Sequence, residues 1–313
     1  MKIGIIGTGR IAHRFVPEAR LVDNIIVVAV CNPNLASAKR FAEEFDIPIY
    51  VGEAKELVEH VDAVYIATPH QTHYIYAKEM LLEGKHVLCE KPMVFSKSQA
   101  EELFAIVEEK NLVLMEGIKT AYCPGFQSLL EVVKSGKIGE VVDVEACFTK
   151  LTPSNLREMM DIEYGGSFLE LGTYCMLPIM KILGLNEDNV TYHKVKAENG
   201  VDIYTKVSFD YVNKTGLAKT GLGVKSEGQL IIAGTKGYVV VQAPWWLTRR
   251  FEVRYEDPNK KEVYEYPFDG QGLRYEIKAF IDMIKAENRS EKVVAKEEII
   301  WLAEKMEMFR GND

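Results

Sequence analysis

The sequence has 313 residues, of which 47% are hydrophobic and 27% are charged, and its formal net charge is -8. This length and composition predict a globular protein of two domains, while the acidic balance excludes the concentrated lysine and arginine that nucleic-acid binding requires. The longest apolar runs have the length of strands, so we expect no segment that crosses a membrane.

The chain opens with an apolar strand that runs into a glycine turn and then into a helix. Residues 1–12 read M-K-I-G-I-I-G-T-G-R-I-A. Gly7 and Gly9 have no side chains, so backbone N–H groups can close around a pyrophosphate, and the small Ala12 lets the helix lie close to the strand. The helix start also presents unpaired donors to the anion. The pattern predicts a dinucleotide-binding turn; the alternative is an ordinary strand–helix turn.

Strands and helices alternate over the next hundred residues. The continuous apolar run at 25–31 is typical of a parallel strand that is buried on both faces. Such alternation predicts a parallel sheet with right-handed crossovers, and we assign residues 1–120 to a Rossmann domain. Further strands are expected at 47–51, 63–67, 86–90 and 112–116, and helices at 35–45, 54–59, 73–83 and 98–110.

Two polar motifs stand where strands of this sheet end. The motif T-P-H at 68–70 follows one strand, and E-K-P at 90–92 closes the next. Ligands of parallel sheets lie beyond the carboxyl ends of the strands, so we expect both motifs beside one crevice. There, Lys91 can donate a hydrogen bond to a substrate oxygen and stabilise developing alkoxide charge. The alternative is a solvated surface lysine.

The pattern changes after a helix at 125–135, because apolar and polar residues then alternate by twos. Short connections, with G-T-K-G at 234–237 as a hairpin turn, predict an antiparallel sheet. The fold class is therefore α/β: an N-terminal Rossmann domain and a C-terminal α+β domain at 121–313, built on an open, mainly antiparallel sheet. Its strands are expected at 141–150, 190–197, 201–212, 215–224, 229–233, 238–242, 251–255 and 262–266, and its last helices at 275–286 and 296–309.

A second candidate for chemistry is the segment G-G-S-F-L-E-L-G-T-Y at 165–174, which reads as a loop followed by a helix start. Glu170 and Tyr174 are one helical turn apart and therefore share a face. A tyrosine whose pKa of about 10 is lowered by an ammonium group can exchange a proton with an alcohol. Lys91 is the candidate ammonium if the second domain lies over the crevice. The alternative is a core tyrosine with its hydroxyl at the rim.

In this order, the motifs G-T-G-R-I-A, T-P-H-Q-T-H, E-K-P and G-G-S-F-L-E-L-G-T-Y resemble the glucose–fructose oxidoreductase / inositol dehydrogenase family. The resemblance spans nearly the whole chain. It implies a Rossmann domain followed by an open antiparallel α/β domain, NAD or NADP as cofactor, and oxidation of sugars, cyclitols or related alcohols.

The resemblance also implies roles for individual residues. Lys91 matches the family's catalytic lysine, whose bond to Pro92 is often cis. Tyr174 falls where most members have a histidine acid/base, and a tyrosine there is similar to the branch that includes dimeric dihydrodiol dehydrogenase. The residues expected to hold the cofactor are Gly7, Thr8, Gly9, Arg10, Ile11, Ala12, Asn32, Thr68, Pro69, His70, His73, Glu90 and Lys91.

Two residues depart from the family's pattern. Glu170, a candidate substrate-binding residue, stands where the family usually has aspartate, so its carboxylate reaches about one methylene further. Asn32 replaces the acid that binds the ribose 2′-hydroxyl of NAD. An uncharged amide rejects neither cofactor strongly, so NAD and NADP both stay open; the missing carboxylate, with Lys39 and Arg40 downstream, favours NADP.

Other candidate side chains are less specific. Arg157 precedes the loop at 165 and is a candidate for contact with a substrate hydroxyl; a surface ion pair is the alternative. His70 and His73 resemble a metal pair, but no third ligand with suitable spacing follows, so no metal site is expected.

From these residues we predict an NAD(P)-dependent oxidoreductase that moves a hydride between nicotinamide and a secondary alcohol of a sugar, polyol or cyclic diol. Two other classes stay open: a non-catalytic NAD(P)-binding sensor or regulator, and an NAD-assisted glycosidase. The first apolar run is a strand rather than a signal peptide, and the five cysteines form no disulfide framework, so we expect a cytoplasmic protein. The resemblance implies a homo-oligomer, a dimer or tetramer, formed through the C-terminal sheet.

Overall fold

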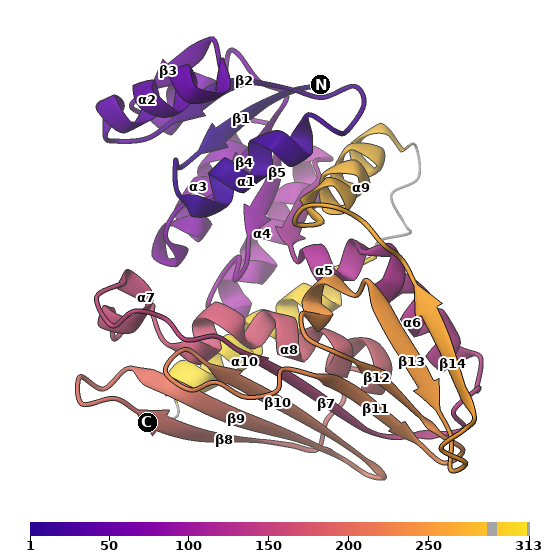
Figure 1. Cartoon of the computed structure of the whole chain (residues 1–313). Coiled ribbons are helices and arrows are strands. Elements are labelled where there is room, and N and C mark those ends of the chain that lie inside the picture. Colours follow the sequence, from indigo (N-terminus) through magenta and orange to yellow (C-terminus); the bar gives the residue numbers. More distant parts are fainter. Residues whose placement is uncertain (287–292, 312–313) are drawn as a thin grey trace. The chain divides into compact units, whose positions relative to one another are not determined.

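A computed structural model describes residues 1–286 and 293–311 of the chain (Figure 1). The chain divides into two compact units, each with its own sheet. The first unit contains Met1–Lys119 and Asp269–Glu307; the second contains Thr120–Phe268 and the end of the last helix from Met308 onward.

The first unit is built on a parallel sheet whose strand order is β3-β2-β1-β4-β5-β6. Strand β1 pairs with β2 on one side and with β4 on the other, so the order reverses between β1 and β4. Open α/β sheets bind ligands at such a switch point. The predicted Rossmann sheet is therefore confirmed, with strands β1 (Lys2–Ile6), β2 (Ile26–Cys31), β3 (Ile49–Val51), β4 (Ala63–Ile66), β5 (His86–Glu90) and β6 (Leu114–Gly117).

The helices of this unit begin where a short polar side chain can cap them. Asn34 accepts a hydrogen bond from the N–H of Ser37 at the start of α2, and Ser96 accepts one from Gln99 at the start of α4. The helix expected at 54–59 is a single 3-10 turn, η1 (Ala54–Leu57). The other helices are α1 (Arg10–Ala19), α2 (Leu35–Phe45), η2 (His70–Thr72), α3 (His73–Leu82), α4 (Lys97–Lys110), α9 (Leu273–Lys285) and α10 (Lys296–Gly311).

Helix α9 lies beside α1, although the two are far apart in sequence (Figure 1). The buried carboxylate of Glu18 on α1 accepts hydrogen bonds from the N–H groups of Gln271 and Arg274 and pairs with the Arg274 guanidinium at 2.7 Å. Residues 269–307 therefore group with the first unit, whereas the prediction assigned them to the second domain. No local sequence pattern indicates which of the two cores a helix near the end of the chain will join.

The second unit contains a sheet with the strand order β14-β13-β12-β11-β7-β10-β9-β8. Strands β7 and β10 pair in parallel, while the other neighbours are antiparallel. The expected mainly antiparallel sheet is confirmed, with strands β7 (Val141–Thr149), β8 (Asn189–Lys196), β9 (Asp202–Tyr211), β10 (Lys214–Gly221), β11 (Leu230–Gly234), β12 (Tyr238–Val241), β13 (Arg250–Arg254) and β14 (Lys261–Glu265).

Helix α8 (Ser167–Leu183) packs on the middle of this sheet, against β7 and β10. A Cβ atom at Gly216 of β10 would lie 2.9 Å from the side chain of Ile179, so the missing side chain lets the helix approach closely. In Figure 1, α6 and α8 lie on the same face of the sheet. The remaining helices of the unit are α5 (Lys119–Tyr122), which begins at the boundary, α6 (Pro124–Lys134), α7 (Arg157–Met160) and η3 (Trp245–Leu247).

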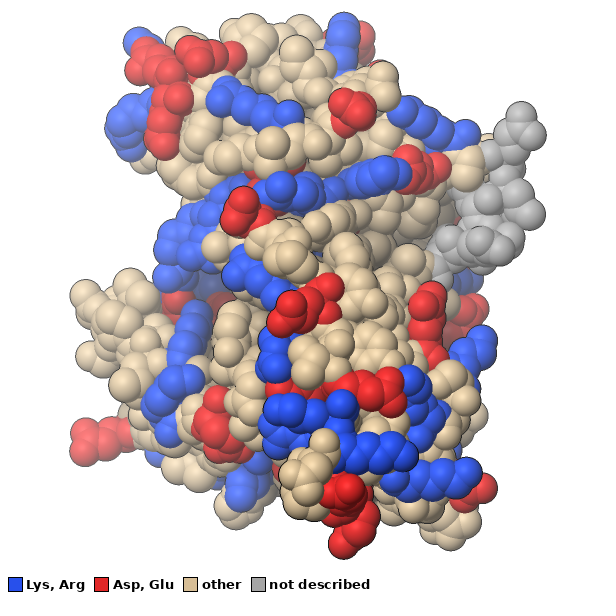
Figure 2. Space-filling model, turned by 45° about the vertical axis from the view of Figure 1, so that its right-hand side comes forward, with Lys and Arg blue, Asp and Glu red and all other residues tan. Residues whose placement is uncertain are grey.

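The surface of the chain carries charges of both signs. On the face drawn in Figure 2, basic and acidic side chains are intermingled. Among residues 1–286 and 293–311, no helix combines the length and the apolar character that crossing a bilayer demands.

Candidate active site

The predicted dinucleotide turn joins β1 to α1. Gly7 has φ +105°, and its N–H donates to the carbonyl of Cys31 at 2.8 Å. A Cβ atom at this position would lie 2.5 Å from the carbonyl oxygen of Ala67, so only glycine fits between β1 and the end of β4. Ala12 on α1 is fully buried, as expected for a residue at the contact between helix and sheet.

The start of α1 fits a diphosphate. Its N-cap residue is Gly9, which supplies no side-chain cap, and its first turn contains no acidic residue. The space next to Gly9 is open, since the nearest heavy atom to a Cβ there would be 3.9 Å away. The first N–H groups of α1 are therefore not occupied by a capping side chain, which is the arrangement that binds a phosphate anion.

Asn32 lies beside this turn, at the end of β2. Its amide donates to the hydroxyl of Thr8 at 2.8 Å, and its oxygen accepts from the N–H of Asn34 at 2.8 Å. The residue that departs from the family's acid thus belongs to the hydrogen-bonded wall of the dinucleotide turn. It brings no negative charge to that wall.

The motifs after β4 and β5 lie at the same edge of the sheet, as predicted, because β4 and β5 are neighbours. His73, which is completely buried, connects them: its Nδ1 lies 2.8 Å from the carbonyl of Pro92, and its Nε2 lies 2.9 Å from the carbonyl of Thr68. A neutral imidazole has one N–H, so both contacts are hydrogen bonds only when the ring carries two protons. In either protonation state His73 contacts the main chain of both motifs, and His70 is buried beside it.

Lys91 stands at the end of β5, partly exposed, and its bond to Pro92 is cis. The preceding Glu90 is 8% exposed and accepts a 2.6 Å hydrogen bond from the phenol of Tyr65. Burial raises the pKa of Glu90, and the charge of Lys91, the Tyr65 hydrogen bond and the charge of Lys119 oppose that rise. The turn that carries Lys91 is thus anchored in the protein interior.

Two further buried acids lie in this region, and sequence reasoning missed both. Burial raises the pKa of Glu116 on β6 to about 7, although the N–H of Met93 donates to its carboxylate at 2.9 Å. Glu276 on α9 is completely buried, and neither of its carboxylate oxygens has a hydrogen-bond partner among the described residues. Burial raises its pKa well above the ordinary value. The available sign was an acid in an otherwise apolar segment, as in L-V-L-M-E at 112–116.

In the second unit, α8 carries the two residues expected on one face. Glu170 and Tyr174 are partly exposed, whereas Phe168, Leu169, Leu171, Gly172, Thr173 and Cys175 are buried. The predicted shared face is confirmed by this pattern. Helix α8 starts at its N-cap Gly166, where the carboxylate of Asp202 accepts hydrogen bonds from the Ser167 hydroxyl at 2.6 Å and the Phe168 N–H at 3.0 Å.

Arg157 and Glu170 form an ion pair across the loop between α7 and α8. The Nη2 atom of Arg157 lies 3.0 Å from Oε1 of Glu170. The Nη1 atom is buried and has no hydrogen-bond partner among the described residues. The structure therefore brings both predicted substrate-binding residues together and leaves one guanidinium nitrogen able to donate to a ligand.

An aromatic pair lies next to Tyr174. The rings of Phe148 and Trp246 stack with their centroids 3.5 Å apart, and Phe148 is 5.5 Å from the Tyr174 ring. Trp245 is fully buried in the same unit and donates to the carbonyl of Cys147. The two tryptophans belong to the 3-10 turn η3, so their side chains do not alternate across a sheet.

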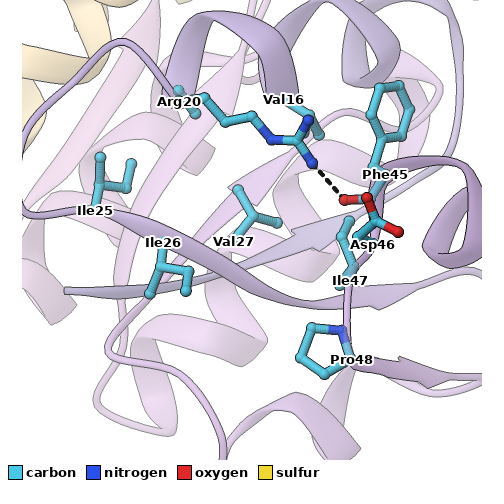
Figure 3. Close-up of a pocket in the computed structure, with 10 residues that line it drawn as sticks. Val16, Arg20, Ile25, Ile26, Val27, Phe45, Asp46, Ile47 and Pro48 are labelled. Atoms are coloured by element: carbon cyan, nitrogen blue, oxygen red, sulfur yellow. Dashed lines mark hydrogen bonds between the residues drawn. The ribbon is translucent and has the colours of Figure 1, made fainter.

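A pocket of about 230 Å³ lies elsewhere in the first unit (Figure 3). Its lining comes from the end of α1, the start of β2 and the segment between α2 and β3, which places it at the amino ends of these strands, away from the dinucleotide turn. The guanidinium of Arg20 at this pocket donates to the carbonyl of Phe45. We assign no catalytic role to it.

The fold, the glycine turn and the uncapped helix start are those of a dinucleotide-binding Rossmann domain. Residues 1–118 match the model of an oxidoreductase family with an NAD-binding Rossmann fold. This match supports the resemblance of the chain to the glucose–fructose oxidoreductase / inositol dehydrogenase (Gfo/Idh/MocA) family that the motifs indicated.

Named relatives match nearly the full length of the chain. It is 29% identical over 322 residues to trans-1,2-dihydrobenzene-1,2-diol dehydrogenase of Sus scrofa, which covers 99% of this chain and 96% of the relative. The Homo sapiens enzyme of the same name is 28% identical with the same coverage. The fold is similar to that of KijD10, a 3-ketoreductase from Actinomadura kijaniata in complex with NADP and TDP-benzene, with a TM-score of 0.83, 24% identity, and coverage of 98% of this chain and 95% of that one.

Proposed function

We propose that this protein is a dehydrogenase that uses NADP to oxidise a secondary alcohol on a small cyclic diol, sugar or polyol, with Lys91 and Tyr174 as its catalytic residues. The observation that carries the proposal is the face of α8, where Tyr174 and Glu170 are the partly exposed residues of an otherwise buried segment. A phenol and a carboxylate placed there by buried neighbours are positioned for a ligand and are not needed for the core.

In the proposed reaction, Tyr174 in its phenolate form takes the hydroxyl proton of the alcohol as the hydrogen on the carbinol carbon leaves with its electron pair as hydride. Lys91 donates a hydrogen bond to the same oxygen and stabilises the negative charge that develops on it. The bound dinucleotide supplies the hydride acceptor. In the opposite direction the same two side chains return the proton to a carbonyl oxygen, because acid and base exchange roles when the reaction is reversed.

Arg157 and Glu170 are proposed to bind the substrate. The buried Nη1 atom of Arg157 is a donor for a second hydroxyl, while Nη2 stays on Glu170. A vicinal diol has a hydroxyl to offer each of Tyr174 and Arg157. The relatives from pig and human are named for such a diol, which supports a cyclic diol as the first substrate to test.

The stacked rings of Phe148 and Trp246 support a substrate with an apolar face. Trp246 is partly exposed, and its stack contacts the ring of Tyr174 through Phe148. Such a surface favours a flat hydrocarbon ring or the C–H face of a sugar. We therefore expect cyclic diols to be used better than open-chain polyols.

NADP is proposed over NAD because Asn32 presents no carboxylate to repel a 2′-phosphate. Lys39 and Arg40 lie on α2, the helix that follows this residue. The 3-ketoreductase of similar fold was crystallised with NADP, which agrees with this choice.

The function is tested with a panel of trans-cyclic diols, sugars and polyols, by following reduced nicotinamide absorbance with NADP and with NAD. Lys91→Met and Tyr174→Phe are each expected to lower kcat by about 10²–10⁴-fold while leaving NADP affinity unchanged. Lys110→Met and Tyr74→Phe, at exposed and partly exposed positions on α4 and α3, serve as controls with wild-type activity. Wild-type turnover in either catalytic variant would remove that residue from the mechanism.

The two other classes give different results in the same panel. A sensor binds NADP and a sugar without any change in nicotinamide absorbance. An NAD-assisted glycosidase releases sugar from aryl glycosides without net consumption of the cofactor. Either result would replace the proposed activity.

We also propose a cytoplasmic homo-oligomer that associates through the sheet of the second unit. All five cysteines are buried free thiols, which supports a reducing compartment. Sedimentation velocity across a range of concentrations tests the oligomer, and a single monomeric species at every concentration would reject it.

A further inference from the structure

The position of Lys91 depends on the short turn that follows β5, because the main chain on either side fixes where its side chain starts. Glu90 ends the strand, and Met93 follows the cis bond of Lys91 to Pro92. His73 holds the carbonyl of Pro92, as described above. The N–H of Met93 donates to Oε1 of Glu116 at 2.9 Å.

Glu116 reaches the turn from the face of the sheet opposite to Glu90. In the pairing of β5 with β6, Cys89 is the partner of Glu116, and Glu90 is the partner of Gly117. Partners in register project to the same face, and successive residues alternate. The carboxylate of Glu90 is therefore held on one face by Tyr65, and that of Glu116 holds the turn from the other.

Both residues of the contact between Glu116 and Met93 are buried. Glu116 is 3% exposed and Met93 is 1% exposed. A buried N–H that loses its only acceptor costs about 1–3 kcal/mol, so the turn would move to find another partner. The charged and titratable groups near Glu116 are Lys91, the thiol of Cys89 on the same face of the sheet, and Glu90 on the opposite face.

We propose that Glu116 is a positioning residue for Lys91, which fixes the turn that carries the catalytic ammonium by accepting the hydrogen bond of the Met93 N–H. The inference rests on the proposed function, since it assumes that Lys91 takes part in catalysis. It adds a residue that the sequence motifs do not contain.

Two substitutions separate the acceptor from the charge. Glu116→Met keeps the length of the side chain and removes the acceptor, and it is expected to lower kcat by about 10–100-fold with an unchanged dissociation constant for NADP. Glu116→Gln keeps an uncharged oxygen for the Met93 N–H, so its kcat is expected to lie between those of Glu116→Met and wild type at pH 8 and to match that of wild type at pH 6, where Glu116 is protonated. Glu252→Met, which replaces a similarly buried acid of the second unit, is the control for placing methionine at such a position.

The pH profile gives a readout that a merely structural role would not move. The pKa of Glu116 is raised to about 7 by burial, against the Met93 hydrogen bond and the charge of Lys91. The carboxylate form, which accepts the stronger hydrogen bond, prevails above this pH. Wild-type kcat should therefore fall as the pH drops from 8 to 6, and this part of the profile should be absent in Glu116→Gln.

The inference is overturned if Glu116→Met folds and turns over like wild type, or if Glu116→Gln keeps the wild-type profile between pH 6 and 8. The second result decides the matter even if Glu116→Met does not fold. The turnover of Lys91→Met distinguishes a failure of the proposed function from a failure of the proposed role of Glu116. Wild-type turnover in Lys91→Met rejects the proposed function, whereas an inactive Lys91→Met beside fully active Glu116 variants rejects only the role of Glu116.

Discussion

The phenol of Tyr65 donates a 2.6 Å hydrogen bond to the carboxylate of Glu90, the residue immediately before Lys91. Both groups are buried, and the Tyr65 ring stacks on Phe15 of α1 with the centroids 3.8 Å apart. Tyr65 thus connects the dinucleotide-binding helix α1 with the turn that carries Lys91, in the interior of the first unit.

Tyr65→Phe is expected to lower the free energy of unfolding by about 1–3 kcal/mol, because the buried carboxylate of Glu90 loses a donor while the stacking on Phe15 remains. Urea denaturation followed by circular dichroism measures the change. Tyr74→Phe, which removes the hydroxyl that contacts the more exposed Glu102, is the matched control and should change stability by less than about 0.5 kcal/mol. Equal losses in the two variants would contradict the special role of the Tyr65 bond.

Asn32→Asp is expected to shift cofactor preference from NADP toward NAD, because the new carboxylate repels a 2′-phosphate and accepts hydrogen bonds from a ribose 2′-hydroxyl. The ratio of the two dissociation constants, from fluorescence titration, should change by about tenfold or more, which corresponds to about 1.4 kcal/mol. Asn34→Asp is the control, since it adds the same charge two residues away at the N-cap of α2. An equal shift in both variants would mean that overall charge, and not contact with the ribose, sets the preference.

Glu18 makes stability depend on acid pH. Although burial alone would raise its pKa, hydrogen bonds from Arg274 and from the N–H of Gln271 hold it below the ordinary value of 4.5. A folded-state pKa below the unfolded one adds stability above the unfolded pKa, and this contribution is lost as the pH falls through the folded pKa. Wild type should therefore lose more unfolding free energy below about pH 5 than Glu18→Gln does.

Thermal denaturation from pH 6 to pH 3 checks this dependence on Glu18. Glu102→Gln, on an exposed pair with Lys78, provides the control for removing one surface carboxylate. Parallel curves for wild type and Glu18→Gln would refute the prediction.

Glu276 has the opposite effect. Burial raises its pKa far above 4.5, so the unfolded chain releases a proton that the folded chain retains. Stability should then decline as the pH rises above about 4.5, by up to about 1.4 kcal/mol per pH unit. In Glu276→Gln this slope should be reduced between pH 5 and pH 8, while Glu297→Gln, at an exposed position of α10, should follow wild type. A slope unchanged in Glu276→Gln would show that the carboxyl is ionised in the folded protein.

The sequence was sufficient to predict the two sheets and the edge at which the motifs gather. Strand–helix alternation and the glycines at positions 7 and 9 are local features of the sequence. They were enough to predict where Ala12 and Lys91 lie in the fold, and helical spacing predicted the face shared by Glu170 and Tyr174. The pairing of Arg157 with Glu170 fits the roles suggested for each, but its geometry depends on a loop whose path no pattern encodes.

Other features depend on contacts between distant segments. Glu276 is on a helix that the sequence assigned to the second domain, and its burial against the first sheet follows from the docking of α9 on α1. Glu116 read as the polar end of an apolar strand, and its bond to Met93 follows from the path of a turn 23 residues earlier.

The contacts of Glu18 with residues 253 and 256 positions later have a consequence for biosynthesis. The ribosome releases the chain from its amino end, so β1 to β6 emerge long before α9 exists. Until then the face of α1 that packs against α9 is uncovered, and the carboxylate of Glu18 cannot pair with Arg274. The nascent Rossmann sheet must persist in an unfinished form while the entire second sheet is translated, and this interval is when the chain is most open to aggregation and to capture by chaperones.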